Sequence, residues 1–374
     1  MSVTRRQVLR YRVHAQQLDR DEDAARSPDD AAILDLGVQD TGPDGALWAL
    51  AVRGVPVRAH DWPSELALAW TVRGAPHAYR RTDLRDVEKA LRPFSEADAA
   101  KRVLTASAPL KAAGIPVLDA LAEVSRTMRS VVRRPTVKGT LSTRMTAQMS
   151  EPYLRWCPGC GATHLYEMTF RLAALHAGLE LEPDTSPPVL RRIPGWPSSQ
   201  VGALTRTGTG DDGPVDVLRS LLHLLGPLTP KQAVGYLDST LRDVTARWPQ
   251  DAVEVEVEGA TAGILAADRD ALEHATGDDS TVRLLGPYDP YLQGRDRELL
   301  VPEKAHHAAL WPSIGRPGAV LVGGEVVGTW RPRASGSRLA LELDPWVPWS
   351  AATTAAVAAQ HERLATFRGM TAVE

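Results

Sequence analysis

The sequence predicts an α+β protein in which three helices followed by a hairpin occur three times before a β-rich C-terminal region. Amphipathic helical periodicity dominates the first half of the chain. Strict alternation of apolar and acidic residues in AVEVEVEG, 252–259, is typical of a half-buried strand. After residue 280 the chain changes to short apolar runs separated by turn residues. These three observations set the fold class.

The first segment, residues 1–113, is expected to hold several helices and one short hairpin. The run SELALAWTVRGAPHAYR, 64–80, is expected to be an apolar helix that leads into a hairpin around Gly74-Ala75-Pro76. Apolar spacing and stop signals predict helices over 4–18, 30–38, 44–54 and 83–91, the last capped by Thr82-Asp83.

The same pattern recurs in residues 114–212 and 213–280. Because three helices and a β-turn are typical of a helix-turn-helix with a wing, the sequence predicts three tandem winged-helix units. Residues 281–374 are expected to form short strands, a hairpin at Gly323-Gly324 and a terminal helix. The later helices are expected at 116–131, 140–149, 163–178, 215–226, 229–239 (capped by Thr229), 241–248 and 350–366. Two further pairs of extended segments are expected, 179–184 with 187–196 and 252–259 with 261–267.

Composition narrows the class of protein. The chain has 374 residues, 43% of them hydrophobic and 24% charged, which is typical of a globular protein. No apolar run has the length of a membrane helix, and the N-terminus has no signal-peptide core, so we expect a cytoplasmic monomer without a membrane partner. Phosphate-loop, HExxH and G-x-S-x-G motifs are absent from the sequence.

The net charge is −3, but basic residues gather in 126–144, where no acid interrupts them. A local basic face on a near-neutral protein suits a DNA binder that makes a few phosphate contacts. Ordinary solvated surface is the alternative explanation.

Two stretches carry a resemblance to a known family. LLGPYDPYLQGRDRELLVP with WPSIGRPGAVLVGGEVVGTWRPR, 284–302 and 311–333, resembles the C-terminal signature of the tandem winged-helix family of AlkZ-like (azinomycin-resistance) and YcaQ-like bacterial DNA glycosylases. AWTVRGAPHAYRRTDL, 69–84, resembles the family's first winged-helix unit. The resemblance implies an enzyme that hydrolyses the N-glycosidic bond of alkylated or bulky-adduct purines in duplex DNA, without a required cofactor.

The family's groove carries Gln–apolar–Gln or Gln–apolar–Asp, and the matching residues here are Gln39, Asp40 and Thr41. Asp40 stands where the family has an apolar residue, and Thr41 stands where it has the second amide or carboxylate. Gln39 could orient water and Asp40 could supply negative charge. Three alternatives stay open: a non-catalytic DNA-binding protein or regulator of the same fold, a structural turn in which Asp40 caps the next helix, and a remnant fold that neither binds DNA nor catalyses a reaction.

Several cations are candidates for DNA contact. His77 is expected to belong to a phosphate-contacting wing or to be a surface histidine that closes a turn. Arg295 and Arg297 alternate with Asp296 on an expected hairpin, where side chains two apart share a face and could grip DNA or form salt bridges with Asp296 and Glu298. The remaining candidates are Arg73, Arg80, Arg133, Arg134 and Lys138.

The chain has only two cysteines, Cys157 and Cys160, which lie in WCPGCGATH and exclude a disulfide framework. Cys157, Cys160 and His164 have the spacing of a zinc knuckle, so a structural zinc is one expectation. A reduced turn without metal and a redox dithiol are the alternatives. A fourth ligand is unassigned, because His176 lies twelve residues beyond His164 on the expected helix.

Overall fold

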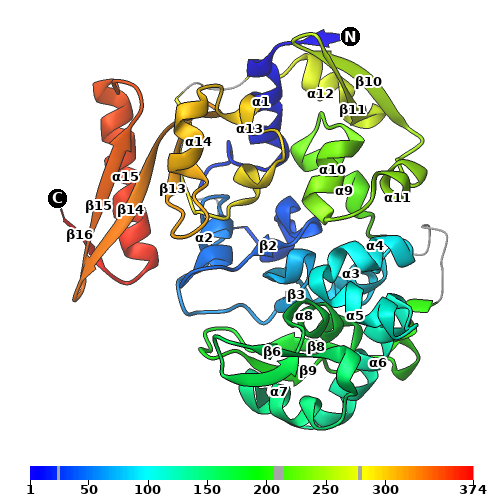
Figure 1. Ribbon diagram of the computed structural model, residues 1–374. Helices are drawn as coiled ribbons and strands as arrows, with labels where there is room; N and C mark the ends of the chain where they lie inside the picture. Colours follow the sequence, from blue (N-terminus) through cyan, green and yellow to red (C-terminus); the bar gives the residue numbers. More distant parts are fainter. Residues whose placement is uncertain (23–25, 206–213, 277–279, 374) are drawn as a thin grey trace. The chain divides into compact units, whose positions relative to one another are not determined.

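The computed structural model describes residues 1–22, 26–205, 214–276 and 280–373 (Figure 1). The chain divides into two compact units, each built from segments that are far apart in the sequence. Unit 1 comprises Met1–Glu65, Leu218–Gln232 and Pro249–Glu374, and unit 2 comprises Leu66–Val217 and Ala233–Trp248. Among the described helices, none combines the length and the apolar character that a membrane span requires.

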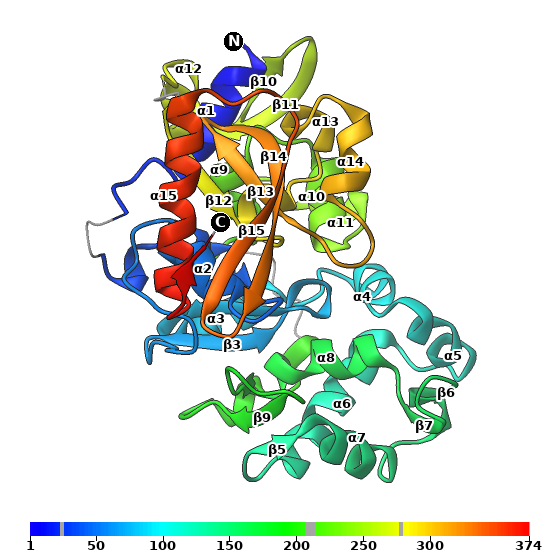
Figure 2. The ribbon, with the colours of Figure 1, turned by 90° about the vertical axis from the view of Figure 1, so that its left-hand side faces the viewer.

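Unit 1 contains a mainly antiparallel C-terminal sheet with the order β12-β13-β14-β15-β16. Its strands are β12 Val282–Leu285, β13 Gly318–Val322, β14 Glu325–Ser335, β15 Arg338–Pro345 and β16 Thr371–Ala372. The predicted turn at Gly323-Gly324 joins β13 to β14, and both glycines have positive φ. Helix α15, Ala351–Phe367, lies along this sheet (Figure 2) and begins at a Ser350 cap. The β-rich region and its terminal helix are therefore confirmed.

A second sheet of unit 1 has the order β1-β10-β11, with β1 Ser2–Val3 parallel to β10 Ala252–Val257 and β11 Ala260–Leu265 antiparallel to it. Helix α1, Arg5–Ala15, packs against this sheet through a cluster that includes Val8, Tyr11 and Ile264. A capping box formed by Thr4 and Gln7 fixes where α1 begins. The alternation in AVEVEVEG thus predicted its strand correctly.

The other elements of unit 1 are short. The helix expected at 30–38 is replaced by two 3₁₀ turns and β2, because Ala31 is extended, with φ of −80° and ψ of 106°, and interrupts the run between the two turns. These short elements of unit 1 are the 3₁₀ turns Pro28–Asp30, Ala32–Asp35, Ala266–Asp268 and Pro290–Gln293, the strand β2 Val38–Gln39, and the helices α2 Gly45–Ala51, α9 Val217–Leu225, α12 Arg269–Glu273, α13 Arg297–Leu300 and α14 Lys304–Leu310.

Two buried ion pairs connect distant segments of unit 1. Arg53 donates to both carboxylate oxygens of Asp289 at 2.8 Å, and neither side chain is exposed. Arg12 donates to Asp296 at 2.5 Å, again in the interior. Pairs of this kind are costly to break from one side, since the remaining charge stays buried.

Unit 2 contains an antiparallel sheet with the order β4-β3-β8-β9-β5. The strands are β3 Leu66–Trp70, β4 Pro76–Arg80, β5 Thr136–Val137, β8 Leu179–Leu181 and β9 Val189–Arg192. The helix expected at the start of the 64–80 run is therefore wrong, whereas the hairpin expected around Gly74-Ala75-Pro76 is present, because β3 pairs with β4. Every residue of β3 is buried, so the strand is apolar on both faces and shows no alternation that would distinguish it from a helix.

Helices cover the rest of unit 2, and a core that includes Val103, Leu110 and Leu121 lies among them. The expected helix over 163–178 begins only at Glu167, because the preceding residues pair as a strand in a two-stranded hairpin. The elements are α3 Leu84–Ala90, α4 Glu96–Arg102, α5 Ser107–Ala112, α6 Val117–Val131, α7 Lys138–Thr146, α8 Glu167–His176, α11 Leu241–Ala246, the hairpin β6 Leu154–Cys157 with β7 Ala162–Leu165, and the 3₁₀ turns Val72–Gly74, Arg81–Asp83, Leu104–Ala106, Glu151–Tyr153, Ser198–Gln200 and Ala203–Thr205. Helix α10, Pro230–Leu237, spans the boundary between the units in sequence and begins at the predicted Thr229 cap.

The compact units cross the predicted division into 1–113, 114–212, 213–280 and 281–374. Strands β3 and β4 come from the first of these segments and β8 and β9 from the second, yet they share one sheet. The boundary between residues 212 and 213 lies outside the described residues. The mixed α+β class is what the structure shows, and the division into winged-helix units stays a prediction.

Candidate functional site

The Gln39–Thr41 segment of unit 1 brings two of its three polar side chains together. Gln39 ends β2, and its Nε2 donates to Thr41 Oγ1 at 2.9 Å. Both residues are half-buried. Residues two apart on an extended chain point to the same side, which explains why this pair meets. The two residues that match the family's polar positions therefore form one hydrogen-bonded pair.

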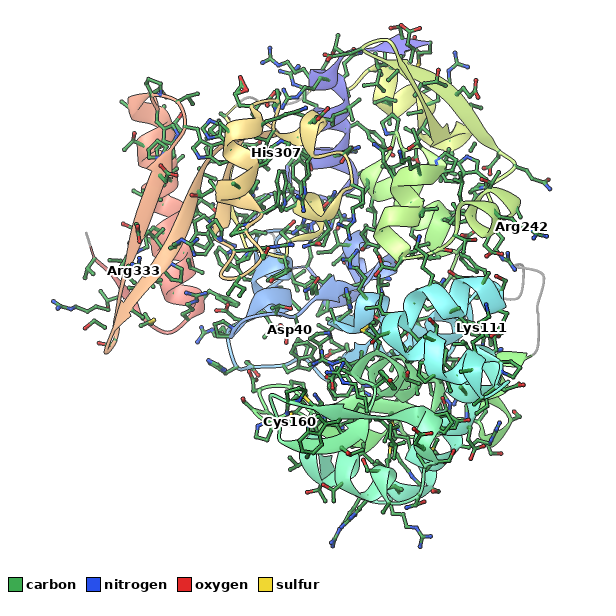
Figure 3. The ribbon with its side chains drawn as sticks, viewed as in Figure 1. Asp40, Lys111, Cys160, Arg242, His307 and Arg333 are labelled. Atoms are coloured by element: carbon green, nitrogen blue, oxygen red, sulfur yellow. The ribbon has the colours of Figure 1, made fainter. Side chains whose placement is uncertain are left out.

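Asp40 turns to the start of the next helix. Its Oδ1 accepts a hydrogen bond from the backbone N–H of Ala46 at 3.0 Å, in the first turn of α2. The first N–H groups of a helix lack partners within it and favour negative charge, so the carboxylate is stabilised there. Asp40 therefore contacts the start of α2, as the capping interpretation expected. Asp40 is labelled in Figure 3.

Glycine at position 45 permits this close approach. A Cβ at Gly45 would lie 3.3 Å from the carbonyl oxygen of Gln39 and 3.7 Å from the Asp40 Cα. Asp44 then ties the same loop to the end of α15, because Arg368 donates to both of its carboxylate oxygens at 2.6 and 3.0 Å. The backbone around Gln39 is thus held by α2 and by the residue that follows α15.

The predicted DNA-contacting cations of unit 2 have different surroundings. Arg133 and Arg134 are exposed and lie just before β5, with Pro135 between them and the strand. Lys138 begins α7, and its Nζ lies 2.6 Å from Glu167. Arg80 is half-buried and lies 3.4 Å from Asp83. Of the exposed pair, Arg133 donates through Nε to the carbonyl oxygen of Ser130 at 3.4 Å.

His77 is buried, with 2% of its surface exposed, so both the phosphate contact and the surface-histidine interpretation conflict with its position. Its Nδ1 lies 2.9 Å from Thr71 Oγ1 and 3.0 Å from the carbonyl oxygen of Ala75. Burial, followed by the charge of nearby Arg73, lowers the pKa of His77 to about 3 and keeps the ring neutral. Arg73 donates to the carbonyl oxygen of Tyr236 at 2.7 Å, and its guanidinium group lies over the Tyr236 ring.

The expected hairpin at Arg295 and Arg297 is also wrong. Asp296 is buried against Arg12, and Arg297 begins the short helix α13, so the two arginines do not alternate on a strand. Arg295 is exposed, whereas the Arg297 guanidinium lies over the Trp311 ring at 4.8 Å. The salt bridge expected with Asp296 forms with a residue from α1 instead.

The two cysteines and His164 come together at the end of the β6–β7 hairpin of unit 2. Their ligand atoms all lie within 4.8 Å of one another. Cys157 is half-buried, and Cys160, which is labelled in Figure 3, is exposed. Hydrogen bonds from His164 and from Cys160 lower the pKa of the Cys157 thiol to about 6, which favours the thiolate.

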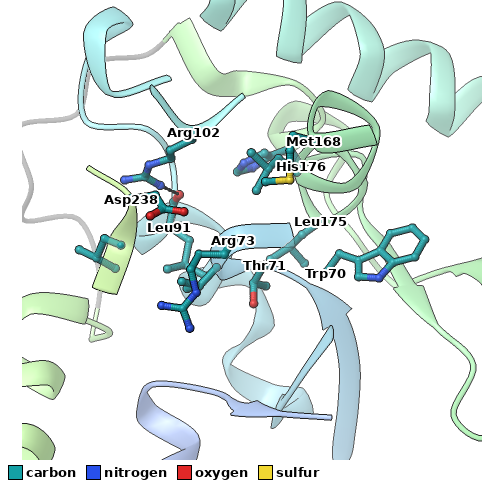
Figure 4. A pocket seen from close by; sticks show the side chains of 12 residues that line it. Trp70, Thr71, Arg73, Leu91, Arg102, Met168, Leu175, His176 and Asp238 are labelled. Atoms are coloured by element: carbon teal, nitrogen blue, oxygen red, sulfur yellow. Dashed lines mark hydrogen bonds between the residues drawn. The ribbon is translucent and has the colours of Figure 1, made fainter. Parts of the chain in front are cut away.

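A pocket in unit 2 was not predicted from the sequence (Figure 4). Apolar side chains such as Trp70, Met168 and Leu175 line it together with Arg73, Arg102, His176 and Asp238. No spacing along the chain could have revealed this pocket, since its lining comes from segments up to 168 residues apart (238 − 70). It does not include the Gln39–Thr41 pair.

Behind the pocket, His176 belongs to a buried polar cluster. Its Nδ1 lies 2.6 Å from Glu88 Oε1, and Arg92 and Gln200 donate to the same carboxylate. Glu88 is fully buried. Burial by itself would raise the pKa of Glu88, but the hydrogen bond and charge of His176 and those of Arg92 outweigh it and lower the pKa to about 2.

Comparisons with known proteins identify the family of this chain. A family described as "DNA glycosylase AlkZ-like" matches residues 33–367. A comparison with curated proteins finds no match. The solved structure of Streptomyces sahachiroi DNA glycosylase AlkZ is similar over 100% of both chains, with a TM-score of 0.67 and 20% identity, which shows a shared fold. The match over most of its length means that this chain belongs to the AlkZ-like DNA glycosylase family.

Proposed function

We propose that the protein is a monofunctional DNA glycosylase that hydrolyses the N-glycosidic bond of alkylated or bulky-adduct purines in duplex DNA. Membership of the AlkZ-like family supports a glycosylase. The observation that carries the proposal is the hydrogen bond between Gln39 and Thr41, the two residues that occupy the polar positions of the family's motif.

The proposed substrate requires few catalytic groups. An N7-alkylated purine is cationic and already a good leaving group, so the bond can break with little acid assistance. The enzyme then needs a polar group that holds the attacking water and negative charge near the electron-poor sugar. Because Gln39 Nε2 donates to Thr41, the amide oxygen of Gln39 is oriented as the acceptor for a water proton.

Thr41 acts in this proposal as a positioning residue for Gln39. Its hydroxyl carries no charge at neutral pH, so it cannot replace a carboxylate as a base. Negative charge would come from Asp40, whose carboxylate is held against α2 by Ala46. The cationic base itself would then supply most of the driving force for bond cleavage.

Duplex DNA would be held by tandem winged-helix units, as the resemblance implies. Arg133, Arg134 and Arg295 are exposed and suited to phosphate contacts. Arg73, Arg80, Lys138 and Arg297 contact protein groups, so they would have to exchange partners to reach DNA.

One observation favours a second candidate, a non-catalytic DNA-binding protein of the same fold. Asp40 serves as a helix cap, and Thr41 supplies no carboxylate, so the segment has a structural purpose without any chemistry. Under this alternative the protein would bind duplex DNA and leave every base in place.

A base-release assay separates the two candidates. The full-length protein in excess is incubated with a duplex that contains one N7-methylguanine, and abasic sites are scored by alkaline cleavage. We expect abasic sites to form faster than in duplex without protein. Release that equals spontaneous depurination, on a duplex that the protein demonstrably binds, would favour the second candidate.

Matched variants of Thr41 test the carrying observation. Thr41→Ser keeps the hydroxyl and should retain release, whereas Thr41→Val is of similar shape but lacks the acceptor. Loss of one hydrogen bond should slow release by about 3- to 10-fold in Thr41→Val, with DNA affinity unchanged. Equal rates in the two variants would contradict the positioning role of Thr41.

A further inference from the structure

We propose that Cys157, Cys160 and His164 bind one zinc ion, which holds the β6–β7 hairpin of unit 2 in place. This site is separate from the Gln39 segment and does not depend on the proposed glycosylase activity. Thiolate and imidazole are the ligands that structural zinc prefers. Three such groups gather at one hairpin end, with their ligand atoms within 4.8 Å of one another.

The hairpin register explains why these side chains meet. Cys157 pairs with Ala162, and Arg155 pairs with His164. Side chains opposite each other on an antiparallel pair, and side chains two apart on one strand, lie on the same face. His164 and Cys157 therefore share a face of the hairpin as diagonal neighbours.

The turn between the strands brings in the second cysteine. The backbone N–H of Cys160 donates to the carbonyl oxygen of Cys157 at 3.2 Å, which closes the Cys-Pro-Gly-Cys turn. Gly161 follows in the left-handed region, with φ of 60°, where a glycine is the least strained residue. The chain thus returns immediately after Cys160 and points its thiol back toward Cys157.

The orientation of His164 leaves a nitrogen available for a metal. Its Nδ1 lies 2.6 Å from the carbonyl oxygen of Leu165, so Nδ1 carries the proton and donates. Nε2 is then the ring nitrogen that faces Cys157, and a metal ion would replace the proton through which it bonds this thiol. A backbone carbonyl that fixes the tautomer in this way is a recurring partner of metal-binding histidines.

Most of the hairpin is exposed or half-buried, and α7 packs against β7. Among its eight residues, only Leu165 is buried, while Trp156 is 62% exposed. An isolated two-stranded hairpin is marginally stable in water, so a metal ion that joins both strands would supply the missing constraint. With three protein ligands, the fourth position of a tetrahedral zinc would hold a water molecule.

Metal content of the full-length protein tests the site. The protein is purified under reducing conditions, without chelators or a metal-affinity tag, and zinc is measured by elemental analysis. We expect about one equivalent in the wild type. The double variant Cys157→Ser with Cys160→Ser should retain less than about one tenth of that amount. Thr163→Ser is the matched control, since Thr163 is exposed and neighbours His164 on the opposite face of β7, and it should retain full zinc.

Cobalt substitution gives a readout that holds even if the double variant does not fold. Co²⁺ added to the metal-free wild type should produce thiolate-to-metal charge-transfer absorption, which only Cys157 and Cys160 can cause because the chain has no other cysteine. His164→Asn should keep this absorption but weaken Co²⁺ binding by at least about tenfold. Amide hydrogen exchange in residues 154–165 should quicken when the metal is removed.

Two results would overturn the proposal. Zinc well below half an equivalent, together with no charge-transfer absorption on addition of Co²⁺, would leave a reduced turn with two thiols. Reversible formation of a Cys157–Cys160 disulfide under mild oxidation, with metal binding absent, would assign the pair to redox chemistry instead.

Discussion

Glu88 offers a prediction whose magnitude follows from the structure. Its carboxylate is fully buried and receives hydrogen bonds from His176, Arg92 and Gln200. These contacts lower its pKa from 4.5 to about 2, despite burial, which acts in the opposite direction. Each factor of ten in proton affinity is worth about 1.4 kcal/mol, so the charged carboxylate stabilises the fold by roughly 3 kcal/mol. Glu88→Gln, which resembles the protonated acid, should lower the free energy of unfolding at pH 7 by a similar amount.

The pH dependence gives this prediction its sign. The pKa of Glu88 is lower in the folded protein than in the unfolded chain, so its stabilisation is fully present above about pH 4.5 and is lost as the pH falls toward about 2. The wild type should lose about 1 kcal/mol of this contribution at pH 4 and about 2 kcal/mol at pH 3, while Glu88→Gln loses none of it. The difference between the two proteins should therefore shrink as the pH falls.

Urea unfolding of both proteins at pH 7, 5, 4 and 3 measures this difference. Glu151→Gln is the control, because Glu151 is exposed in the same unit and should shift the free energy of unfolding by less than about 0.5 kcal/mol. A wild-type-to-variant difference that stays constant between pH 5 and pH 3 would refute the reasoning.

Two further predictions concern backbone geometry and DNA binding. A Cβ at Gly178 would lie 2.3 Å from the Trp196 ring, on a residue with φ of 68°, so Gly178→Ala should destabilise the protein by about 2–4 kcal/mol. A Cβ at Gly139 in α7 would have no atom within 4 Å, so Gly139→Ala should stabilise the protein by up to about 1 kcal/mol. Thermal or urea unfolding of the two variants measures the difference. If about five phosphate contacts form, log K for duplex binding should fall with log salt at a slope of about −4 to −5. Replacing Arg133 and Arg134 by alanine should make this slope less negative by about 2. An unchanged slope would show that Arg133 and Arg134 do not contact DNA. Equal free energies of unfolding for Gly178→Ala and Gly139→Ala would contradict the steric argument.

The fold could be predicted where one segment carries its own periodicity. Helix α6, strands β10 and β11, and the hairpin turn at Gly323-Gly324 all follow from local patterns of apolar residues and turn glycines. The strand Leu66–Trp70 could not be recognised, because its neighbours bury both of its faces and no alternation remains. Tertiary pairing also shortened the helix expected from residue 163, since the first residues of that run pair with β6.

The candidate site could be located by motif but not described in detail. The resemblance pointed to Gln39 and Thr41, and the two-residue spacing explains their contact. The turn of Asp40 toward Ala46 depends on the start of α2, six residues further along. The positions of Asp296 and His77 depend on partners that the folded chain supplies, and the partner of Asp296 is 284 residues away. Such contacts leave no local signal in the sequence.

The role of Gln39 is the central claim, and one paired measurement tests it most directly. Single-turnover release of N7-methylguanine and affinity for the same duplex are measured for the wild type and for Gln39→Ala. If the Gln39 amide positions the attacking water, the variant should lose at least about 100-fold in release while its DNA affinity stays within a few-fold of the wild type. Release and affinity that fall together by the same factor would show that Gln39 serves DNA binding, which contradicts the proposed mechanism.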